Sequence, residues 1–197
     1  GAALLREALA SLLGKAAAPR AIEPLVVDNG SDAPETLAFL ETLRGREGHA
    51  VLRLDEPFNW SRLNNLAARQ ARGELLLFLN DDTRMLTAGW DRRLRRLLAE
   101  PDVGAVGARL VYEDFTLQHA GVVFGTEGLA AHEGVGAPME AEGPGGRWQR
   151  LRRVGAVTGA FLACRREVFE RLGPFDEQAL GVTFNDVDFC LRLRAAG

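Results

Sequence analysis

The sequence has little of several residue types that would mark particular classes of protein. Its 197 residues include two cysteines, Cys164 and Cys190, and a single lysine, Lys15. Two cysteines among apolar neighbours are too few for a disulfide framework or a zinc site, which predicts buried free thiols in a reducing compartment. No apolar run approaches the ~20 residues of a membrane span, and no signal peptide opens the chain. We therefore expect a soluble, cytoplasmic protein, and a peripheral association with the inner face of a membrane stays open.

The charge balance shows no strong excess of either sign. The formal net charge is −3, with 24 basic residues against 27 acidic ones, so nothing indicates a nucleic acid partner. Four arginines, Arg92, Arg93, Arg95 and Arg96, lie on one side of a predicted helix, which we interpret as a solvated face. Hydrophobic residues at 47% are an ordinary globular value, and this length suits one domain with a sizeable core.

The stretch of residues 74–83, E-L-L-L-F-L-N-D-D-T, carries the strongest local signal. Its unbroken apolar run predicts a strand buried on both faces of an α/β sheet. Asn80, Asp81 and Asp82 then fall at the carboxyl edge of that sheet, where open α/β folds bind ligands. Adjacent carboxylates repel unless a cation joins them, and hard oxygen ligands suit Mg²⁺ or Mn²⁺. A solvated turn after the strand is the alternative.

Acids occur at two further points that the fold could bring to the same edge. Residues 24–28 predict a short buried strand that ends at Asp28. Asp186 and Asp188 lie in the first turn of a predicted helix, where acids suit the helix dipole without any catalytic role. Convergence of the three groups at one sheet edge would explain them together better than three independent structural roles.

Residues 56–65, E-P-F-N-W-S-R-L-N-N, run from a loop into a predicted helix. Asparagines at a helix start usually cap it, and Ser61 is the predicted N-cap. Aromatic rings beside amide groups could instead hold a nucleobase. Residues 154–164 predict a strand interrupted at Thr158 and Gly159, where a small residue lets a ligand or a backbone come close.

The glycine-rich residues 125–146 predict a long flexible loop that could act as a lid. His119 and His132 flank its start, and a lone histidine more often has a structural role. Helices alternate with strands through the first hundred residues, which predicts an α/β fold with a mostly parallel sheet flanked by helices. The later strands, with few helices between them, predict an added mixed or antiparallel part.

Seven segments in this order resemble family 2 glycosyltransferases with the GT-A fold, most of all the rhamnosyltransferase-like members. They are V-V-D-N-G-S (26–31), F-N-W-S-R-L-N-N (58–65), G-E-L-L-L-F-L-N-D-D-T (73–83), Q-H-A-G-V-V (118–123), V-T-G-A (157–160), G-P-F-D-E (173–177) and F-N-D-V-D-F-C-L-R (184–192). Each segment is weak evidence alone, but the ordered set is specific. The resemblance implies a Rossmann-like, mostly parallel sheet with a mixed C-terminal part in one domain, residues 1–197. Residues 1–100 would be its nucleotide-binding half and residues 101–197 its acceptor and catalytic half.

The resemblance also implies roles for individual residues. Asp186 matches the general base, and Asp82 with Asn80 matches the metal-binding D-x-D motif, which implies Mn²⁺ or Mg²⁺. Asparagine at the first position leaves one charge fewer than the family motif. The implied donor-binding residues are Asp28, Asn29, Asn59, Ser61, Asn64, Asn80 and Asp81. The implied acceptor and sugar residues are Thr158, Gly159, Asp188 and His132.

The implied function is inverting, metal-dependent transfer of a hexosyl-type sugar in bacterial cell-surface polysaccharide synthesis. The donor would be a dTDP- or UDP-linked sugar, and the acceptor a hydroxyl of a glycan or lipid-linked glycan. The residue types suit this chemistry, since a cation can stabilise the leaving diphosphate while a carboxylate deprotonates the acceptor. A non-catalytic module that binds a nucleotide or glycan stays open. A phosphotransferase with aspartates after a strand needs a nucleophilic Asp where Asn80 stands, which disfavours it.

Family members usually begin with a strand of the type V-S-I-I-I-P-T and continue beyond the position of Gly197. That strand lies between the strands that end at Asp28 and at Asn80. The resemblance therefore implies a fragment that lacks the first strand and the C-terminal part. An exposed gap between two apolar strands should destabilise it, so we expect residues 1–197 alone to be weakly active or inactive. Robust sugar transfer by this chain would refute the expectation.

Overall fold

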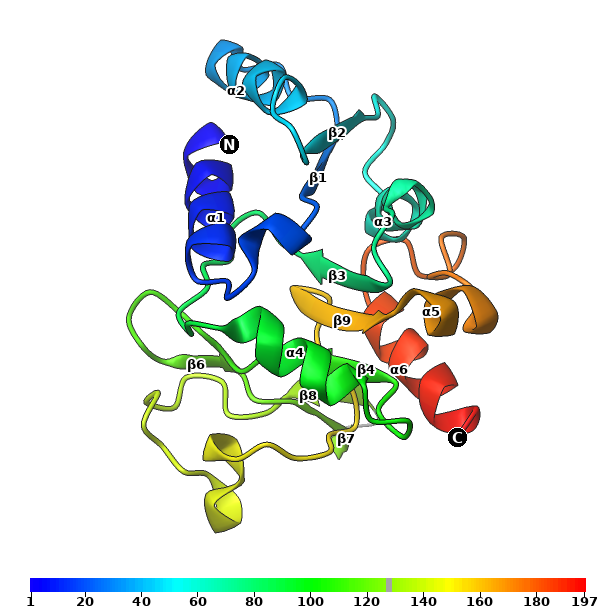
Figure 1. Cartoon of the computed structure of the whole chain (residues 1–197). Helices are drawn as coiled ribbons and strands as arrows, with labels where there is room; N and C mark the ends of the chain where they lie inside the picture. Colours follow the sequence, from blue (N-terminus) through cyan, green and yellow to red (C-terminus); the bar gives the residue numbers. More distant parts are fainter. Residues whose placement is uncertain (127–128) are drawn as a thin grey trace.

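The computed structural model of the chain describes residues 1–126 and 129–197 (Figure 1). The α-helices are α1 (Ala2–Gly14), α2 (Pro34–Arg44), α3 (Trp60–Gln70), α4 (Trp90–Leu98), α5 (Arg166–Leu172) and α6 (Asn185–Ala195), with short 3-10 helices η1 (Pro19–Ala21) and η2 (Pro144–Gln149). The strands are β1 (Leu25–Asp28), β2 (Ala50–Arg53), β3 (Leu75–Leu79), β4 (Ala105–Gly107), β5 (Leu110–Val111), β6 (Leu117–His119), β7 (Val122–Thr126), β8 (Leu129–His132) and β9 (Phe161–Arg165).

The two strands that end next to predicted site residues, β1 at Asp28 and β3 at Leu79, belong to two sheets. β1 and β2 pair in parallel, with Val26 opposite Val51. β9 lies between β3 and β4 and runs antiparallel to both, so β3 and β4 point the same way. Ala163 of β9 is opposite Leu77 on one side and Val106 on the other. The predicted α/β class is confirmed, and the antiparallel β9 supplies the mixed part expected from the later strands.

β1 and β3 belong to separate sheets. Within the described residues, β1 bonds to β2 and β3 bonds to β9, with no ladder between β1 and β3. In Figure 1 the β1–β2 pair and α2 lie above the β3–β9–β4 sheet. A small core of Ala2, Phe39, Leu40 and Leu43 packs α1 and α2 together beside β1 and β2. The expectation that a further strand belongs between β1 and β3 stays a prediction.

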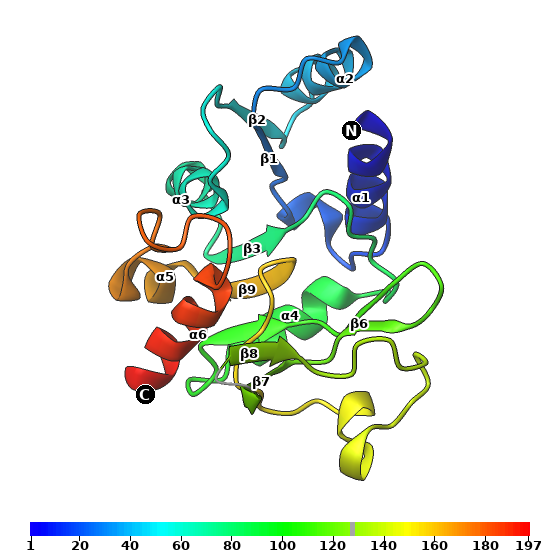
Figure 2. The same cartoon turned by 180° about the vertical axis from the view of Figure 1, so that it is seen from behind.

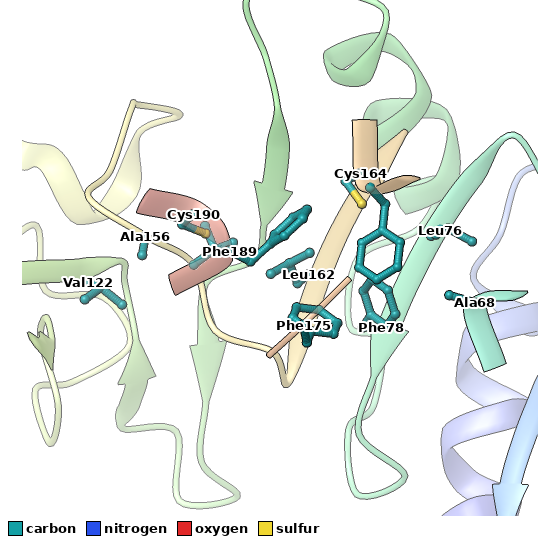
Figure 3. Packing of buried hydrophobic residues seen from close by; sticks show 12 residues of the cluster. Ala68, Leu76, Phe78, Val122, Ala156, Leu162, Cys164, Phe175, Phe189 and Cys190 are labelled. Atoms are coloured by element: carbon teal, nitrogen blue, oxygen red, sulfur yellow. The ribbon is translucent and has the colours of Figure 1, made fainter. Parts of the chain in front are cut away.

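The largest core lies where β3, β9, α3, α5 and α6 meet, and it is rich in aromatic rings (Figure 3). Phe175 is 1% exposed at its centre. The centroid of its ring lies 5.0 Å from those of Trp60 and Phe78. It lies 5.3 Å from that of Phe169 and 5.4 Å from that of Phe189. Edge-to-face contacts of this kind join elements that are far apart in the sequence.

Both cysteines lie in this core as buried free thiols, as the composition predicts. Burial raises the pKa of Cys164 to about 12 and that of Cys190 to about 11. The reactive form of a cysteine is the thiolate, so neither side chain can serve as a nucleophile near neutral pH.

The start of α3 differs from the prediction. Asn59 occupies the N-cap position with extended backbone angles, and its Oδ1 accepts a hydrogen bond from Arg62 N at 2.8 Å. Ser61 lies inside the first turn and is fully buried. The prediction of Ser61 as the N-cap is therefore wrong, because Asn59 already satisfies the N–H group that a cap residue serves.

Residues 154–164 do not form one interrupted strand. β9 begins only at Phe161, after a turn in which Phe161 N donates to Thr158 O at 3.1 Å. The turn carries Gly159 so close to Trp60 that an added Cβ would lie 3.0 Å from the indole ring. A small residue is required here, as the sequence indicated, but the close neighbour is a side chain.

The prediction of a long flexible loop over residues 125–146 is wrong in part, and residues 127–128 lie outside the described residues. β8 falls within this segment and pairs with β7. Glu133 is 7% exposed and accepts hydrogen bonds from Trp148 Nε1 at 2.8 Å and from Arg152 at 2.6 Å. A buried carboxylate with several donors fixes this segment against η2 and the residues that follow it.

His119 makes this region sensitive to acid. Its side chain is 1% exposed, and its Nδ1 has no hydrogen-bond partner among the described residues. Burial first, and then the neighbouring charges of His132 and Arg152, lower the pKa of His119 to about 4. A histidine in an unfolded chain takes up a proton near pH 6.5. The unfolded state therefore binds more protons, and the folded state loses stability, as the pH falls from about 6.5 towards 4.

We expect acidification from pH 7.5 to 4.5 to lower the free energy of unfolding by on the order of 2–3 kcal/mol through His119. The variant His119→Leu should lose much less over the same range. Burial acts to raise the pKa of Glu133, but hydrogen bonds from Trp148 and two arginines outweigh it and lower that pKa below 4.5. The stabilisation by Glu133 is therefore lost only at more acidic pH. Urea unfolding at both pH values measures the effect, and equal losses in wild type and variant would contradict it.

Candidate active site

The polar residues after β3 lie in a tight turn. Asn80 N donates to Ala160 O at 3.2 Å, and Asn80 O accepts from Thr83 N at 3.2 Å. Asp81 and Asp82 lie between these two contacts and are exposed, with 63% of the Asp81 side chain accessible. Asp81 Oδ2 lies 4.0 Å from the amino group of Gly1, and both carboxylates remain accessible to a cation or a ligand from solvent.

Asp186 reaches the same edge from the other end of the chain. It lies in the first turn of α6, where its Oδ2 accepts from Gly159 N at 2.8 Å. Its Oδ1 accepts from Val187 N at 2.8 Å. The two N–H groups orient the carboxylate, and each oxygen keeps a lone pair for a further donor. A half-buried carboxylate held in this way can accept a proton from a substrate hydroxyl.

Gly159 and Ala160 connect the two groups of acids. Gly159 N bonds to Asp186, and Ala160 O bonds to Asn80 N, so two consecutive residues hold both. Trp60 closes the other side, because a Cβ on Gly159 would lie 3.0 Å from its ring and 3.7 Å from the Asp186 Cβ. The structure thus brings together two of the three acidic groups that the sequence analysis places at one edge.

Asp188 faces a different part of the molecule. Two residues along a helix are separated by roughly 200° around its axis, so Asp188 points away from Asp186. Its Oδ2 accepts from Arg192 Nε at 2.9 Å, and Arg192 also donates to Leu172 O at 2.8 Å. Thr158 is 8% exposed, and its Oγ1 accepts from Ala160 N at 3.3 Å. Thr158 and Gly159 therefore lie beside Asp186, whereas Asp188 is engaged in a separate ion pair.

The end of β1 forms a second polar group. Asp28 is 4% exposed, pairs with Arg53 Nη1 at 2.8 Å, and accepts from Ser31 N at 3.0 Å. Asn29 Nδ2 donates to two backbone carbonyls beyond β2, at 2.9 and 2.8 Å. No hydrogen bond among the described residues joins Asp28 to Asn80 or Asp186. The sequence analysis missed Arg53. The only sign of its role in the sequence is its position at the end of β2, the strand that pairs with β1.

Three predicted donor-binding residues of α3 make hydrogen bonds inside the protein. Asn59 Nδ2 donates to Glu177 O at 2.8 Å, and Ser61 Oγ donates to Leu180 O at 2.6 Å. Asn64 Nδ2 donates to Trp60 O at 2.9 Å within the helix. Trp60 itself packs into the aromatic core, while its neighbour Phe58 is 60% exposed.

His132 lies on β8, outside the Asp186 group. Its ring packs edge-on against that of His119, with centroids 4.7 Å apart. It is opposite Val122 in the β7–β8 pair, and Val122 N donates to Ala156 O at 3.0 Å. Ala156 comes three residues before Gly159, and among the described residues no hydrogen bond joins His132 to Asp186.

The oxygen atoms after β3 suit a hard divalent cation in kind. Among the described residues, no cluster of three or more His, Cys, Asp or Glu side chains forms a closed metal site. Asn80, Asp81 and Asp82 offer too few ligands for a complete octahedral shell. They fit an ion that keeps several waters and shares oxygen atoms with a bound phosphate, which is how Mg²⁺ and similar ions are usually held in phosphate sites.

Comparison with known proteins identifies the family of the chain. The sequence model of Glycosyl transferase family 2 matches residues 2–173. The chain is 44% identical over 196 residues to the O-antigen biosynthesis protein RfbC of Myxococcus xanthus, which covers 98% of this chain and 15% of that protein. It is 40% identical over 195 residues to the uncharacterized protein y4gI of Sinorhizobium fredii, covering 98% of this chain and 21% of that protein. The mannosyltransferase PcManGT from Pyrobaculum calidifontis, solved in complex with GDP-Man and Mn²⁺, aligns with a TM-score of 0.70 and 19% identity over 100% of this chain and 50% of that one.

The chain therefore belongs to glycosyltransferase family 2. Its fold is the GT-A fold of the solved glycosyltransferases that it matches. It spans about a fifth or less of the length of the two curated relatives. Within residues 1–126 and 129–197, no helix is both long and apolar enough to cross a membrane.

Proposed function

We propose that the chain carries the catalytic domain of an inverting, metal-dependent glycosyltransferase. The observation that carries the proposal is the pair of contacts at Gly159 and Ala160, which hold Asp186 beside the turn that begins at Asn80. One carboxylate is thereby oriented for proton transfer next to a turn with two exposed carboxylates. This arrangement matches what transfer from a nucleotide sugar needs: a base for the acceptor and a place for a charged leaving group.

In the proposed reaction, Asp186 takes the proton of an acceptor hydroxyl while the oxygen of that hydroxyl attacks the anomeric carbon of the donor. The bond from oxygen to that carbon forms while the bond to the nucleoside diphosphate breaks, which inverts the carbon. Asp82 and Asn80 would hold Mn²⁺ or Mg²⁺, which supplies positive charge beside the departing diphosphate. Gly159 and Thr158 would lie next to the sugar, because they flank Asp186. Asp28 and Asn29 would contact the nucleoside.

The proposed biological setting is bacterial cell-surface polysaccharide synthesis. It is supported by the name of the Myxococcus relative, an O-antigen biosynthesis protein. The proposed donor is a dTDP- or UDP-linked sugar, including a rhamnosyl donor, and the acceptor is a glycan or a lipid-linked glycan. The mannosyltransferase neighbour was solved with GDP-Man, so GDP-linked sugars belong in any screen.

A donor screen tests the proposal. The natural chain that contains residues 1–197 is mixed with Mn²⁺ and each of a panel of UDP-, dTDP- and GDP-linked sugars, and its melting temperature is recorded. A donor at 100 times its Kd should add about 2.7 kcal/mol to the stability, and that donor should then release its nucleoside diphosphate. Binding without release would favour the non-catalytic module, and the absence of both would overturn the proposal.

Asp82 provides a test of the metal ligands. We expect Asp82→Ala to raise the Mn²⁺ concentration needed for half-maximal transfer at least about tenfold, since a direct ligand should matter no less than outer-shell partners, which are worth 10–100-fold. The side chain is exposed, so the variant should fold as the wild type does. Transfer rates measured across a Mn²⁺ series give the result. Asp102→Ala, which removes an exposed carboxylate paired with Arg153, is the control, and equal Mn²⁺ dependence in both variants would contradict the assignment.

A further inference from the structure

One face of α3 holds the segment that leads into α6, residues 175–184, which we call the pre-α6 loop. Asn59 Nδ2 donates to Glu177 O at 2.8 Å. Ser61 Oγ donates to Leu180 O at 2.6 Å. Figure 2 shows this loop lying directly beside α3, between α5 and α6. Polar side chains at the start of one helix thus satisfy two carbonyl groups of a loop more than a hundred residues away in the sequence.

Asn65 continues the same row one turn further along α3. Its Nδ2 donates to Phe175 O at 2.9 Å, and its Oδ1 accepts from Phe175 N at 3.0 Å. Ser61 and Asn65 are four residues apart, so they lie on one face of the helix. They are 0% and 1% exposed. A nucleotide bound from solvent could not touch either side chain in this arrangement.

The backbone of the pre-α6 loop packs closely against the start of α3. Ser61 N donates to Gly181 O at 3.0 Å, which satisfies an N–H group that the first helical turn leaves open. A Cβ on Gly181 would lie 2.8 Å from Asn59 Nδ2, so only glycine fits there without a shift. The contacts fix the position of the loop along its length rather than at one end.

The loop ends in a backbone conformation that its sequence does not favour. Phe184 has φ +61°, in the left-handed region that bulky residues rarely adopt. α6 begins at the next residue, and Asp186 follows. The direction in which α6 leaves the loop therefore depends on a strained residue, which persists where the surroundings hold it. The contacts with α3 are part of those surroundings.

We propose that Asn59, Ser61 and Asn65 are positioning residues for Asp186 and do not contact the donor. The inference deepens the proposed function and rests on it, since it takes Asp186 as the group that acts on the acceptor. A shift of the pre-α6 loop would move the Asp186 carboxylate relative to Gly159, and a misplacement of about 1 Å can cost about 100-fold in rate. The three side chains thus act on the reaction through α6.

Two variants separate this role from others. Asn59→Asp keeps an oxygen for Arg62 N, and aspartate caps helices as well as asparagine does. It replaces the donor to Glu177 O with a carboxylate oxygen, so it removes the loop contact and retains the cap. Ser61→Ala removes the hydroxyl that bonds to Leu180 O. The control is Thr42→Ala, which deletes a hydroxyl that bonds within α2 to Ala38 O on an exposed turn.

The kinetic test uses the natural chain that contains residues 1–197, with the sugar nucleotide and acceptor found in the donor screen. We expect each variant to lower kcat about tenfold or more while the KM for the sugar nucleotide stays within about twofold, because an interaction that acts only on the reacting geometry lowers kcat alone. Thr42→Ala should match the wild type in both. A rise in that KM with kcat retained would mean that Asn59 and Ser61 contact the donor, and would overturn the proposal.

A second measurement needs no substrate. Amide hydrogen exchange of residues 176–188 in the ligand-free protein should be faster in Asn59→Asp and Ser61→Ala than in the wild type or Thr42→Ala. Unchanged exchange in both variants would mean that these contacts do not hold the loop in place, and would overturn the proposal. If the wild type turns over no sugar nucleotide, the proposed function fails. Faster exchange in the two variants would even then support the conclusion that α3 fixes the position of the loop.

Discussion

Replacing Asp186 with asparagine is expected to lower the rate of sugar transfer by about 10²–10⁴-fold while donor binding changes little. Asparagine has nearly the same shape, and its Oδ1 can still accept from Gly159 N or Val187 N. Its amide nitrogen cannot take a proton from an acceptor hydroxyl. If Asp186 is the base, the variant loses the chemical step and keeps the geometry around it.

The loss should be in kcat, and the folded state should survive. The carboxylate accepts two hydrogen bonds, at 2.8 Å each, and asparagine can satisfy only one, which costs roughly 1 kcal/mol of stability. Initial rates and donor affinity with Mn²⁺, measured side by side, give the result. Asp102→Asn, an exposed carboxylate paired with Arg153, is the matched control. Transfer by Asp186→Asn within about threefold of the wild type would contradict the role.

Replacing Phe175 with alanine is expected to have the largest effect on stability, about 3–5 kcal/mol. The ring is 1% exposed and lies in contact with four other aromatic rings. Its removal would leave a cavity lined by rings from α3, β3, α5 and α6, which the fixed backbone of those elements can only partly fill. A loss of this size is a large share of the 5–15 kcal/mol that usually holds a domain folded.

Urea unfolding followed by circular dichroism measures this loss. Phe115→Ala is the control, because Phe115 is 61% exposed and a surface substitution usually changes stability by within about 0.5 kcal/mol. A cost below about 1 kcal/mol for Phe175→Ala would mean that the aromatic cluster does not hold these elements together. In Figure 3, Phe175 lies between Phe78 of β3 and Phe189 of α6, the helix that carries Asp186, so its ring joins these two elements.

Much of the fold follows from local patterns in the sequence. The apolar run 75–79 forms β3, as its unbroken character predicts, and the polar residues after it lie in an exposed turn at the strand end. The α/β class and the added antiparallel part follow from the order of helices and strands. These features depend on neighbours in the sequence, so a pattern read along the chain can reveal them.

The errors arose where distant segments decide the structure. The sequence analysis made Ser61 a helix cap, but the cap is Asn59, two residues earlier, and Ser61 bonds instead to the pre-α6 loop. The glycine-rich segment was predicted to be a flexible loop from its many glycines, but Glu133 within it is buried. Trp148 and two arginines further along the chain supply its partners.

The sequence alone determined which chemistry is available: oxygen ligands after a buried strand, a carboxylate at the start of a late helix, and a set of motifs in the order of one family. Only the tertiary structure decided which of them meet. Asp186 and Asn80 come together because Gly159 and Ala160 bond to both, whereas Asp188 turns away on the same helix to pair with Arg192. Such contacts depend on hydrogen bonds between segments far apart along the chain, whose pairing no local pattern specifies.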